Sequence, residues 1–526
     1  MALLACSFAA AAENPTYPFP DALQLITEEP AGDASWNSRE CTKYMKLLGP
    51  LEYGGESAVP SRMVNDGNGN VYIGNMFTDF EGSGWLKGST DSEGSINLKF
   101  PQIMFDEEYS DSKHYYYYAC CVRLNEDKTD LELDAEQTVT LVRDNDGTLR
   151  ISDPDVAIGI CYVYDPAAGD QAVGIGNEGC ELRWFGIAYS EVKWVPVNTS
   201  AAKIPDGVEI QQYALCHSTG ARFVELAVDG SRILIPGLAE DPEACIVGNI
   251  SEDGRTVSFT TNQFLCVTAS GDFFCYMVAA APEDIEDPET GQIIHTIAPA
   301  DSFTALWDSH NKTLTFAEPE TGFSISNGES KVGGGDIYLE PRLSQQDSYV
   351  AAAPTAPQIV AYNPYNDGQG YGTLNFNIPT WTSEGLLVDP ERMFYNILLN
   401  DGQVMTLTPD SYTELSSDMT DIPLSFMDNY DIFCMGINHA LYLYSGDYER
   451  IGVQSFVEVD GKRYYSPAVY DKDSGIDSIA VSTGNIVETY YLDLSGTRID
   501  RPAHGVFAIK CTRYDDGSLK TEKIIR

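Results

Sequence analysis

The chain has 526 residues, and its 79 Asp and Glu against 32 Lys and Arg give a formal net charge of −47. Such a surface repels phosphates and anionic lipids, so nucleic acid is excluded as a partner. Hydrophobic residues make up 43% of the chain, which is enough for packed cores, and the length predicts several domains. The 45 Gly, 27 Pro and 31 Tyr favour strands and tight turns, and therefore an all-β, multidomain fold.

The chain begins with an apolar segment, residues 1–12, followed by the polar turn-forming residues 13–15. Small residues at Ala10 and Ala12 before a polar break are typical of the end of a secretory signal peptide, although the basic start is missing. We interpret residues 1–12 as a signal peptide remnant, with lipidation of Cys6 as the alternative. No later segment has 18 uninterrupted apolar residues, so we expect no transmembrane helix.

An internal repeat follows the leader. Strand-like blocks around Ile73 and Ile235 lie 162 residues apart and recur in the same order and spacing. Each copy consists of short alternating strands separated by Gly, Asn and Asp turns. We therefore expect two tandem β units, residues 13–195 and 196–345, built as a sandwich or meander and forming either one domain or two.

Residues 341–357 are rich in Pro, Ala and Ser, lack periodicity and form the best linker candidate. Short strands at sandwich spacing then continue over residues 346–470. Their Pro-rich entry, Tyr-rich middle strand and final Ser466-Pro467 resemble a fibronectin-type-III-like module. Exposed aromatic rings beside amide groups suit glycan binding, and the candidates here are Tyr362, Tyr365, Tyr371 and Trp381.

A calcium site is the one cofactor for which the sequence gives a pattern. Asp471, Asp473 and Asp477 place oxygens at alternate positions around a Gly, as calcium loops do. Ordinary Asx-Gly turns explain the same pattern without metal, so we expect no cofactor and hold calcium as the alternative. The 12 Cys show no metal-binding spacing, and adjacent Cys120 and Cys121 should point to opposite faces of a strand. Disulfides are compatible with export, but the sequence does not assign their partners.

The last segment, residues 471–526, has three or four short strands joined by Leu-Ser-Gly-Thr, Pro-x-x-Gly and Asp-Gly turns. It resembles the C-terminal sorting domain of the type IX (Por) secretion system of Bacteroidetes, with Thr497 as a departure because an Arg is usual there. The residues that match that family pattern are Leu494, Gly496, Arg498, Pro502, Gly505, Phe507 and Lys510. The whole chain resembles exported Bacteroidetes surface proteins. This resemblance implies the secretion machinery as a partner and a location at the cell surface, at the outer membrane or outside the cell.

The sequence contains no catalytic motif. None of the six His stands at metal-ligand spacing on a helix, and no nucleophile elbow, phosphate loop or dinucleotide fingerprint occurs. We expect a non-enzymatic surface or secreted protein that binds a glycan or a host or matrix ligand. Two alternatives stay open: a secreted carbohydrate-active hydrolase with an Asp/Glu pair, and a structural spacer or fimbria-like component.

Overall fold

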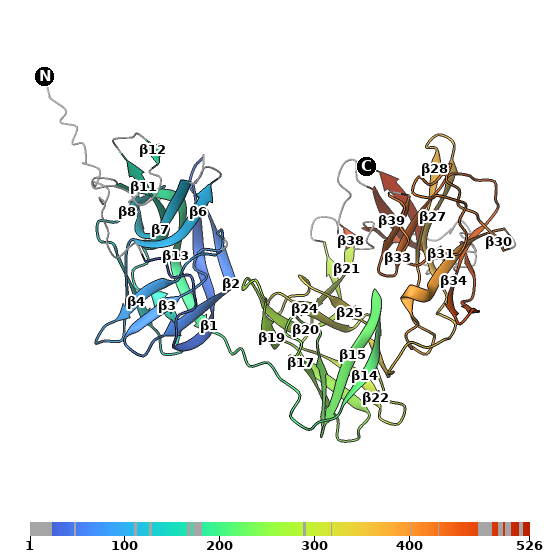
Figure 1. Ribbon diagram of the computed structural model, residues 1–526, viewed down its shortest axis with the longest axis horizontal. Coiled ribbons are helices and arrows are strands. Elements are labelled where there is room, and N and C mark those ends of the chain that lie inside the picture. The colour runs from blue at the N-terminus through green and yellow to red at the C-terminus, as the bar shows by residue number, and fades with distance from the viewer. Residues whose placement is uncertain are drawn as a thin grey trace. The chain divides into compact units, whose positions relative to one another are not determined.

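A computed structural model gives the structure of the chain (Figure 1). It describes residues 24–525 except 47–48, 81, 110–112, 126–128, 166–169, 172–180, 288–290, 317, 401, 430, 472–485, 493–497, 500–506 and 515–518. The fold is all-β and multi-sheet, as predicted, and the helical element among these residues is the short 3-10 turn η2 (Pro390–Arg392). Two compact units are distinguished, residues 1–200 with 266–275, and residues 201–265 with 276–526. The finer division into four parts after the leader stays a prediction.

The first repeat forms one large sheet that closes on itself. Eight strands follow one another in the order β1-β2-β3-β4-β5-β9-β10-β13, and β13 pairs with β1 to complete a ring. Beyond the ring, β13 also pairs with β11, which continues the sheet through β7 to β6. The strands are β1 (Asp33–Met45), β2 (Glu52–Asn65), β3 (Asn70–Ile73), β4 (Leu86–Thr90), β5 (Ile96–Lys99), β6 (Gln102–Tyr109), β7 (Lys113–Leu124), β8 (Leu131–Leu133), β9 (Thr138–Arg143), β10 (Leu149–Ile151), β11 (Val156–Asp165), β12 (Asp170–Gln171) and β13 (Glu181–Pro196).

The second repeat follows the same path. Its closed barrel runs β14-β15-β16-β17-β18-β22-β23-β26, and a smaller sheet contains β19-β20-β24-β25 with β21 paired to β20. The strands are β14 (Ile210–His217), β15 (Gly220–Asp229), β16 (Arg232–Pro236), β17 (Cys245–Ile250), β18 (Thr256–Thr260), β19 (Gln263–Val267), β20 (Phe274–Glu286), β21 (Ile293–Pro299), β22 (Ser302–Asp308), β23 (Thr313–Phe316), β24 (Gly322–Ser326), β25 (Ile337–Leu339) and β26 (Arg342–Gln345). The long strand β13 of the first repeat takes the positions that β25 and β26 together occupy in the second. The predicted repeat is therefore confirmed in its strand order.

Equivalent glycines support this correspondence. Gly88 in β4 and Gly248 in β17 each face the next strand, where an added Cβ would lie 2.5 Å from Ile96 or 2.4 Å from Val257. A side chain at either position would collide with its neighbour. The two copies thus require the same residue for the same packing reason.

Residues 346–470 form two sheets around one core. One sheet has the order β27-β28-β33-β32, and the other has β30-β29-β34-β35 with β31 and β36 at its sides. The strands are β27 (Gln358–Asn366), β28 (Tyr371–Asn377), β29 (Met393–Leu399), β30 (Gln403–Val404), β31 (Ile422–Pro423), β32 (Ile432–Met435), β33 (Asn438–Leu443), β34 (Ile451–Val459), β35 (Lys462–Tyr465) and β36 (Val469–Tyr470). Both sheets contribute to one core, including Leu374, Leu441, Ile397 and Val453. Two packed antiparallel sheets agree with the predicted sandwich.

The C-terminal segment forms a separate small sheet with the order β38-β37-β39-β40. Its strands are β37 (Ile486–Leu492), β38 (Arg498–Ile499), β39 (Phe507–Tyr514) and β40 (Leu519–Ile525). The predicted short strands are present, and β37 pairs with β38 and β39 while β39 also pairs with β40, all antiparallel. Among the described residues, no helix is long and apolar enough to cross a membrane.

Cys120 and Cys161 form a disulfide between the neighbouring strands β7 and β11. The adjacent Cys121 packs inside the first barrel, whereas Cys120 belongs to a cluster on the opposite side of the strand. The expectation that this Cys pair points to opposite faces is confirmed.

Candidate functional site

The sheet β27-β28-β33-β32 has one side in the core and one side facing outward. Leu374, Phe376, Leu441 and Leu443 pack into the core. Because successive side chains of a strand alternate between the faces, the residues between them point away from the core. We call the outward set the amide–aromatic face: Asn363, Tyr371, Thr373, Asn375, Asn377, Phe433, Met435, Asn438, Ala440 and Tyr442.

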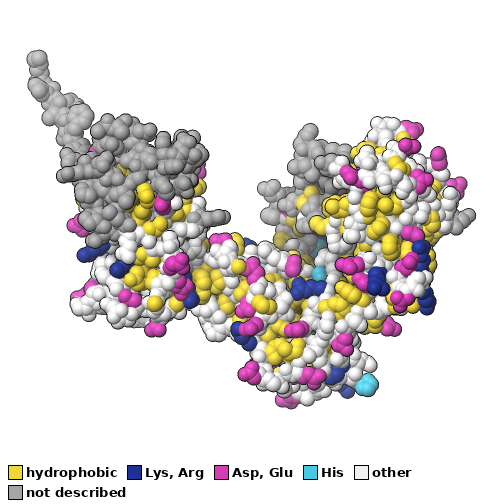
Figure 2. Space-filling model, in the orientation of Figure 1, with side chains coloured by type: hydrophobic (Ala, Val, Ile, Leu, Met, Phe, Trp, Pro, Cys, Tyr) yellow, Lys and Arg dark blue, Asp and Glu magenta, His cyan; other side chains and the backbone are white. Residues whose placement is uncertain are grey.

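The composition of this face sets it apart from the rest of the chain. None of the residues in its four strands is Asp, Glu, Lys or Arg, although the protein carries a net charge of −47. Acidic side chains are spread over the surface shown in Figure 2. Phe433 and Met435 are 47% and 60% exposed, so apolar atoms of this sheet reach solvent. Aromatic rings and neutral amides on a pleated surface can bind an uncharged polar ligand.

Two tyrosines from different strands meet at one end of the face. The rings of Tyr371 in β28 and Tyr442 in β33 lie 5.1 Å apart between centroids, at an interplanar angle of 54°. Partial burial, followed by the effect of Tyr371, raises the pKa of Tyr442, so its hydroxyl stays protonated and able to donate. Next to the pair, the amide of Asn363 donates to the hydroxyl of Thr373 at 2.9 Å.

Contacts on the core side of β33 fix the position of this strand, which carries part of the amide–aromatic face. His439 lies in the core, with its ring stacked on Phe376 at 5.4 Å. Its ring nitrogens lie 3.0 Å from the carbonyl oxygen of Ile437 and 2.9 Å from that of Leu424. Burial lowers the pKa of His439, against the opposing effect of both carbonyls. These contacts fix the strand that carries Tyr442.

The structure separates the four predicted glycan-binding residues. Only Tyr371 lies on the amide–aromatic face. Tyr362 is paired with Leu374 and packs against the core, and Tyr365 lies over Gly446, 3.2 Å from the position of an added Cβ. Trp381 belongs to a small cluster with Cys216 and Leu387 at the junction of the second barrel and the sandwich.

At the junction that contains Trp381, the side chain of Gln346 forms a pair of hydrogen bonds with the backbone of Leu387. The carboxamide of Gln346 accepts a hydrogen bond from the backbone N–H of Leu387 at 2.7 Å and donates to its carbonyl at 2.9 Å. Both groups are buried. The surroundings of Trp381 therefore serve packing between the barrel and the sandwich.

Tyr442, Phe433 and the amide of Asn438 are among the site residues that sequence reasoning missed. The segment Asn438–Leu443 alternates polar or small residues with buried ones, which was the signal for a half-buried strand. The pairing of this strand with β28 is what brings Tyr442 to Tyr371, and that pairing is non-local.

Of the three predicted calcium ligands, Asp473 and Asp477 lie outside the described residues. The carboxylate of Asp471 accepts a hydrogen bond from the backbone N–H of Ile451 at 3.1 Å. Within the part of the chain that the structure describes, no group of three His, Cys, Asp or Glu is placed to hold a metal ion. Calcium binding by these residues stays a prediction.

Most of the predicted sorting residues also lie outside the described part of the chain, namely Leu494, Gly496, Pro502 and Gly505. Phe507 begins β39, and Lys510 lies within it. The guanidinium of Arg498 in β38 donates to the carbonyl oxygen of Ile293 at 2.6 Å and lies 4.0 Å from the ring centre of Tyr490. Comparison of the chain with protein-family models, curated proteins and solved structures finds no match.

Proposed function

We propose that this chain is an exported, non-enzymatic protein that binds a neutral glycan on the amide–aromatic face. The observation that carries the proposal is the absence of charged residues from the four strands of this face in a chain of net charge −47. A charged ligand would find no counter-charge in these strands. An uncharged ligand with many hydroxyl groups needs no counter-charge and can form hydrogen bonds with the amides of this face.

The side chains of the face match the two kinds of surface that a sugar ring offers. The apolar C–H face of a pyranose packs on an aromatic ring, here Tyr371 or Tyr442. Its hydroxyl groups both donate and accept hydrogen bonds, as do the carboxamides of Asn375, Asn377 and Asn438. Because the sheet is already ordered by its core, little side-chain freedom beyond these groups is lost on binding.

Export is the second part of the proposal. The apolar leader and the sorting-like tail support it from the sequence. The Cys120–Cys161 disulfide supports it from the structure, because disulfides persist in oxidising compartments and are rare in the cytosol. Removal of residues 486–526 in the native host is expected to abolish surface display, and unchanged display would contradict the sorting role of the tail.

A glycan array with the purified chain tests the binding site. We expect neutral polysaccharides among the hits, and Tyr371→Ala and Tyr442→Ala should each weaken binding at least tenfold, about 1.4 kcal/mol. Tyr465→Ala is the matched control, since Tyr465 is 44% exposed on β35 in the other sheet of the same module. Its affinity should stay within twofold of the wild type.

Three outcomes would count against the proposal. Equal losses in Tyr371→Ala and Tyr465→Ala would place the glycan elsewhere. Turnover of a polysaccharide would favour the hydrolase alternative, in which two carboxylates act as acid and base or nucleophile. Binding to none of the arrayed glycans would favour a structural spacer.

A further inference from the structure

Four charged side chains form a network of ion pairs in the first barrel. Arg39 in β1 is fully buried, and its guanidinium pairs with the carboxylate of Glu56 at 2.7 Å. Lys43 pairs with Glu56 at 3.4 Å and with Asp79 at 2.5 Å, and the hydroxyl of Tyr189 donates to Asp79 at 2.7 Å. Two cations thus compensate two carboxylates. Burying such groups is costly unless each is paired, so this set must be complete to be tolerated.

The second barrel shows that the fold does not require this set. Arg39 is paired with Trp194, which in turn pairs with Leu149 on β10. In the second barrel, the same three-strand register joins Leu215, Leu343 and Leu314. An apolar residue therefore occupies the place of Arg39 where only packing is needed. The charges of the first barrel are an addition to the shared fold.

The strands that carry these charges are also longer than their counterparts. The β14–β15 hairpin turns directly after His217, whereas β1 and β2 stay paired from Cys41 with Glu56 to Met45 with Glu52. Lys43 and Glu52 belong to this extension, and Glu56 lies where it begins. The first repeat thus has a segment, absent from the second, that places charged side chains at the rim of its barrel.

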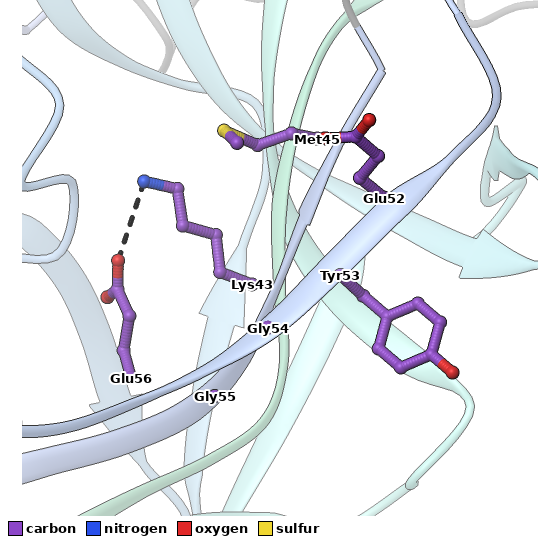
Figure 3. A pocket seen from close by; sticks show the side chains of 7 residues that line it. All are labelled: Lys43, Met45, Glu52, Tyr53, Gly54, Gly55 and Glu56. Atoms are coloured by element: carbon purple, nitrogen blue, oxygen red, sulfur yellow. Dashed lines mark ion pairs between the residues drawn. The ribbon is translucent and has the colours of Figure 1, made fainter. Parts of the chain in front are cut away.

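A hollow of about 230 Å³ lies on this extension, and we call it the rim hollow. Its lining residues are Lys43, Met45, Glu52, Tyr53, Gly54, Gly55 and Glu56 (Figure 3). Gly54 lies opposite Lys43 in the strand pair, and an added Cβ there would meet no atom within 4 Å. The missing side chain of Gly54 leaves open the space between Lys43 and Glu56 on one side and Met45 and Glu52 on the other.

We propose that the rim hollow binds a cationic side chain of a peptide, a primary ammonium group on an apolar stem. Lys43 and Glu56 neutralise each other at one end (Figure 3). Glu52 is exposed, and no ion pair joins it to any residue that the structure describes. Its carboxylate is the uncompensated charge of the hollow. An ammonium group satisfies it, and the methylene stem lies along Met45 and the aliphatic part of Lys43.

The test compares two immobilised tripeptides, Gly-Lys-Gly and Gly-norleucine-Gly, which share the stem and differ in the ammonium group. We expect the full chain to bind the first at least tenfold more tightly than the second by surface plasmon resonance. Gly54→Trp fills the hollow and should lower that affinity at least tenfold. Ser57→Trp is the matched control, because Ser57 is exposed on the same strand β2 and is not among the lining residues of the hollow.

Neither Gly54 nor Ser57 has a positive φ, so both Trp variants are expected to fold, which circular dichroism and the melting temperature check. Glu52→Gln keeps the shape of the hollow and should remove the preference for Gly-Lys-Gly. No preference between the peptides in the wild type, or equal affinities of Gly54→Trp and Ser57→Trp, would overturn the proposal. The glycan site lies on other strands, so either proposal can fail alone.

Discussion

The side chain of Gln263 pairs with the backbone of Val247 as if it were a strand residue. Its carboxamide oxygen accepts from the N–H of Val247 at 2.7 Å, and its Nε2 donates to the carbonyl of Val247 at 2.8 Å. In the first repeat, Gln102 makes the same two bonds to Lys87, both at 2.8 Å. Each glutamine thus extends the ladder at the edge of a barrel strand and satisfies backbone groups that would otherwise lack partners.

Replacing Gln263 by Met should therefore destabilise the second barrel. The variant keeps the side-chain volume but leaves the N–H and carbonyl of Val247 unpaired, at a cost of about 1–3 kcal/mol. Urea denaturation followed by circular dichroism measures the difference. Gln369→Met is the control, since Gln369 is exposed in the turn after β27, and a similar loss there would contradict the role given to Gln263.

Asp79 links stability of the first barrel to acid pH. Burial would raise the pKa of Asp79, but the hydrogen bonds from Lys43 and Tyr189 outweigh it, so the folded-state pKa lies below the ordinary 3.8. The resulting stabilisation is present above pH 3.8 and is lost as the pH falls through the folded-state pKa. Asp79→Asn should thus cost about 1–2 kcal/mol at pH 7, and this cost should shrink as the pH falls through the folded-state pKa of Asp79.

Hydrogen exchange of peptides from β1 and β13 reports this difference, because Lys43 and Tyr189 lie on these strands. Asp33→Asn is the control, as Asp33 is exposed at the start of β1. A cost for Asp79→Asn that does not change between pH 7 and pH 2 would show that Asp79 acts only through packing.

The Cys120–Cys161 disulfide should stabilise the first unit. It joins residues separated by 41 positions. Closing a loop of that size lowers the entropy of the unfolded chain, which stabilises the folded state by about 2–4 kcal/mol. Cys120→Ala is expected to lower the melting temperature of this unit, and dithiothreitol should lower that of the wild type but not of the variant. Fragment ions of the tryptic disulfide-linked peptides that place the bond on Cys121 instead of Cys120 would contradict the assignment.

Local patterns in the sequence were sufficient for the strands and the repeat. Burial alternates in the short strand around Ile73, whereas the strand around Ile235 is buried at four consecutive residues, so it is the matching order and spacing of the blocks that shows that they correspond. Ring closure was not predictable in this way, because it joins β1 to β13 across most of the first repeat. Nothing in either strand identifies its partner.

The residues of the candidate sites also divide into those that local sequence identifies and those that only non-local pairing brings into place. Tyr371 stood in a loop-like, Tyr-rich segment and could be selected from sequence, whereas its partner Tyr442 follows 71 residues later in an ordinary alternating strand. Arg39 lies in the polar segment Asp33–Met45, which gives no local sign of a buried cation. Its burial follows from the enclosure of the ring by strands distant in sequence.

His295 makes one hairpin of the second repeat sensitive to pH. Its ring nitrogens lie 2.7 Å from Asp284 and 2.8 Å from Glu320, and hydrogen bonds to these carboxylates raise the pKa of His295 above 6.5. This contribution is fully present below pH 6.5 and is lost as the pH rises through the folded-state pKa. The β20–β21 hairpin should exchange its amide protons faster at pH 8.5 than at pH 5.5, after correction for intrinsic rates.

In His295→Gln that difference should disappear, whereas the exposed His310→Gln serves as the control and should retain it. An unchanged pH dependence in His295→Gln would assign the effect to another group.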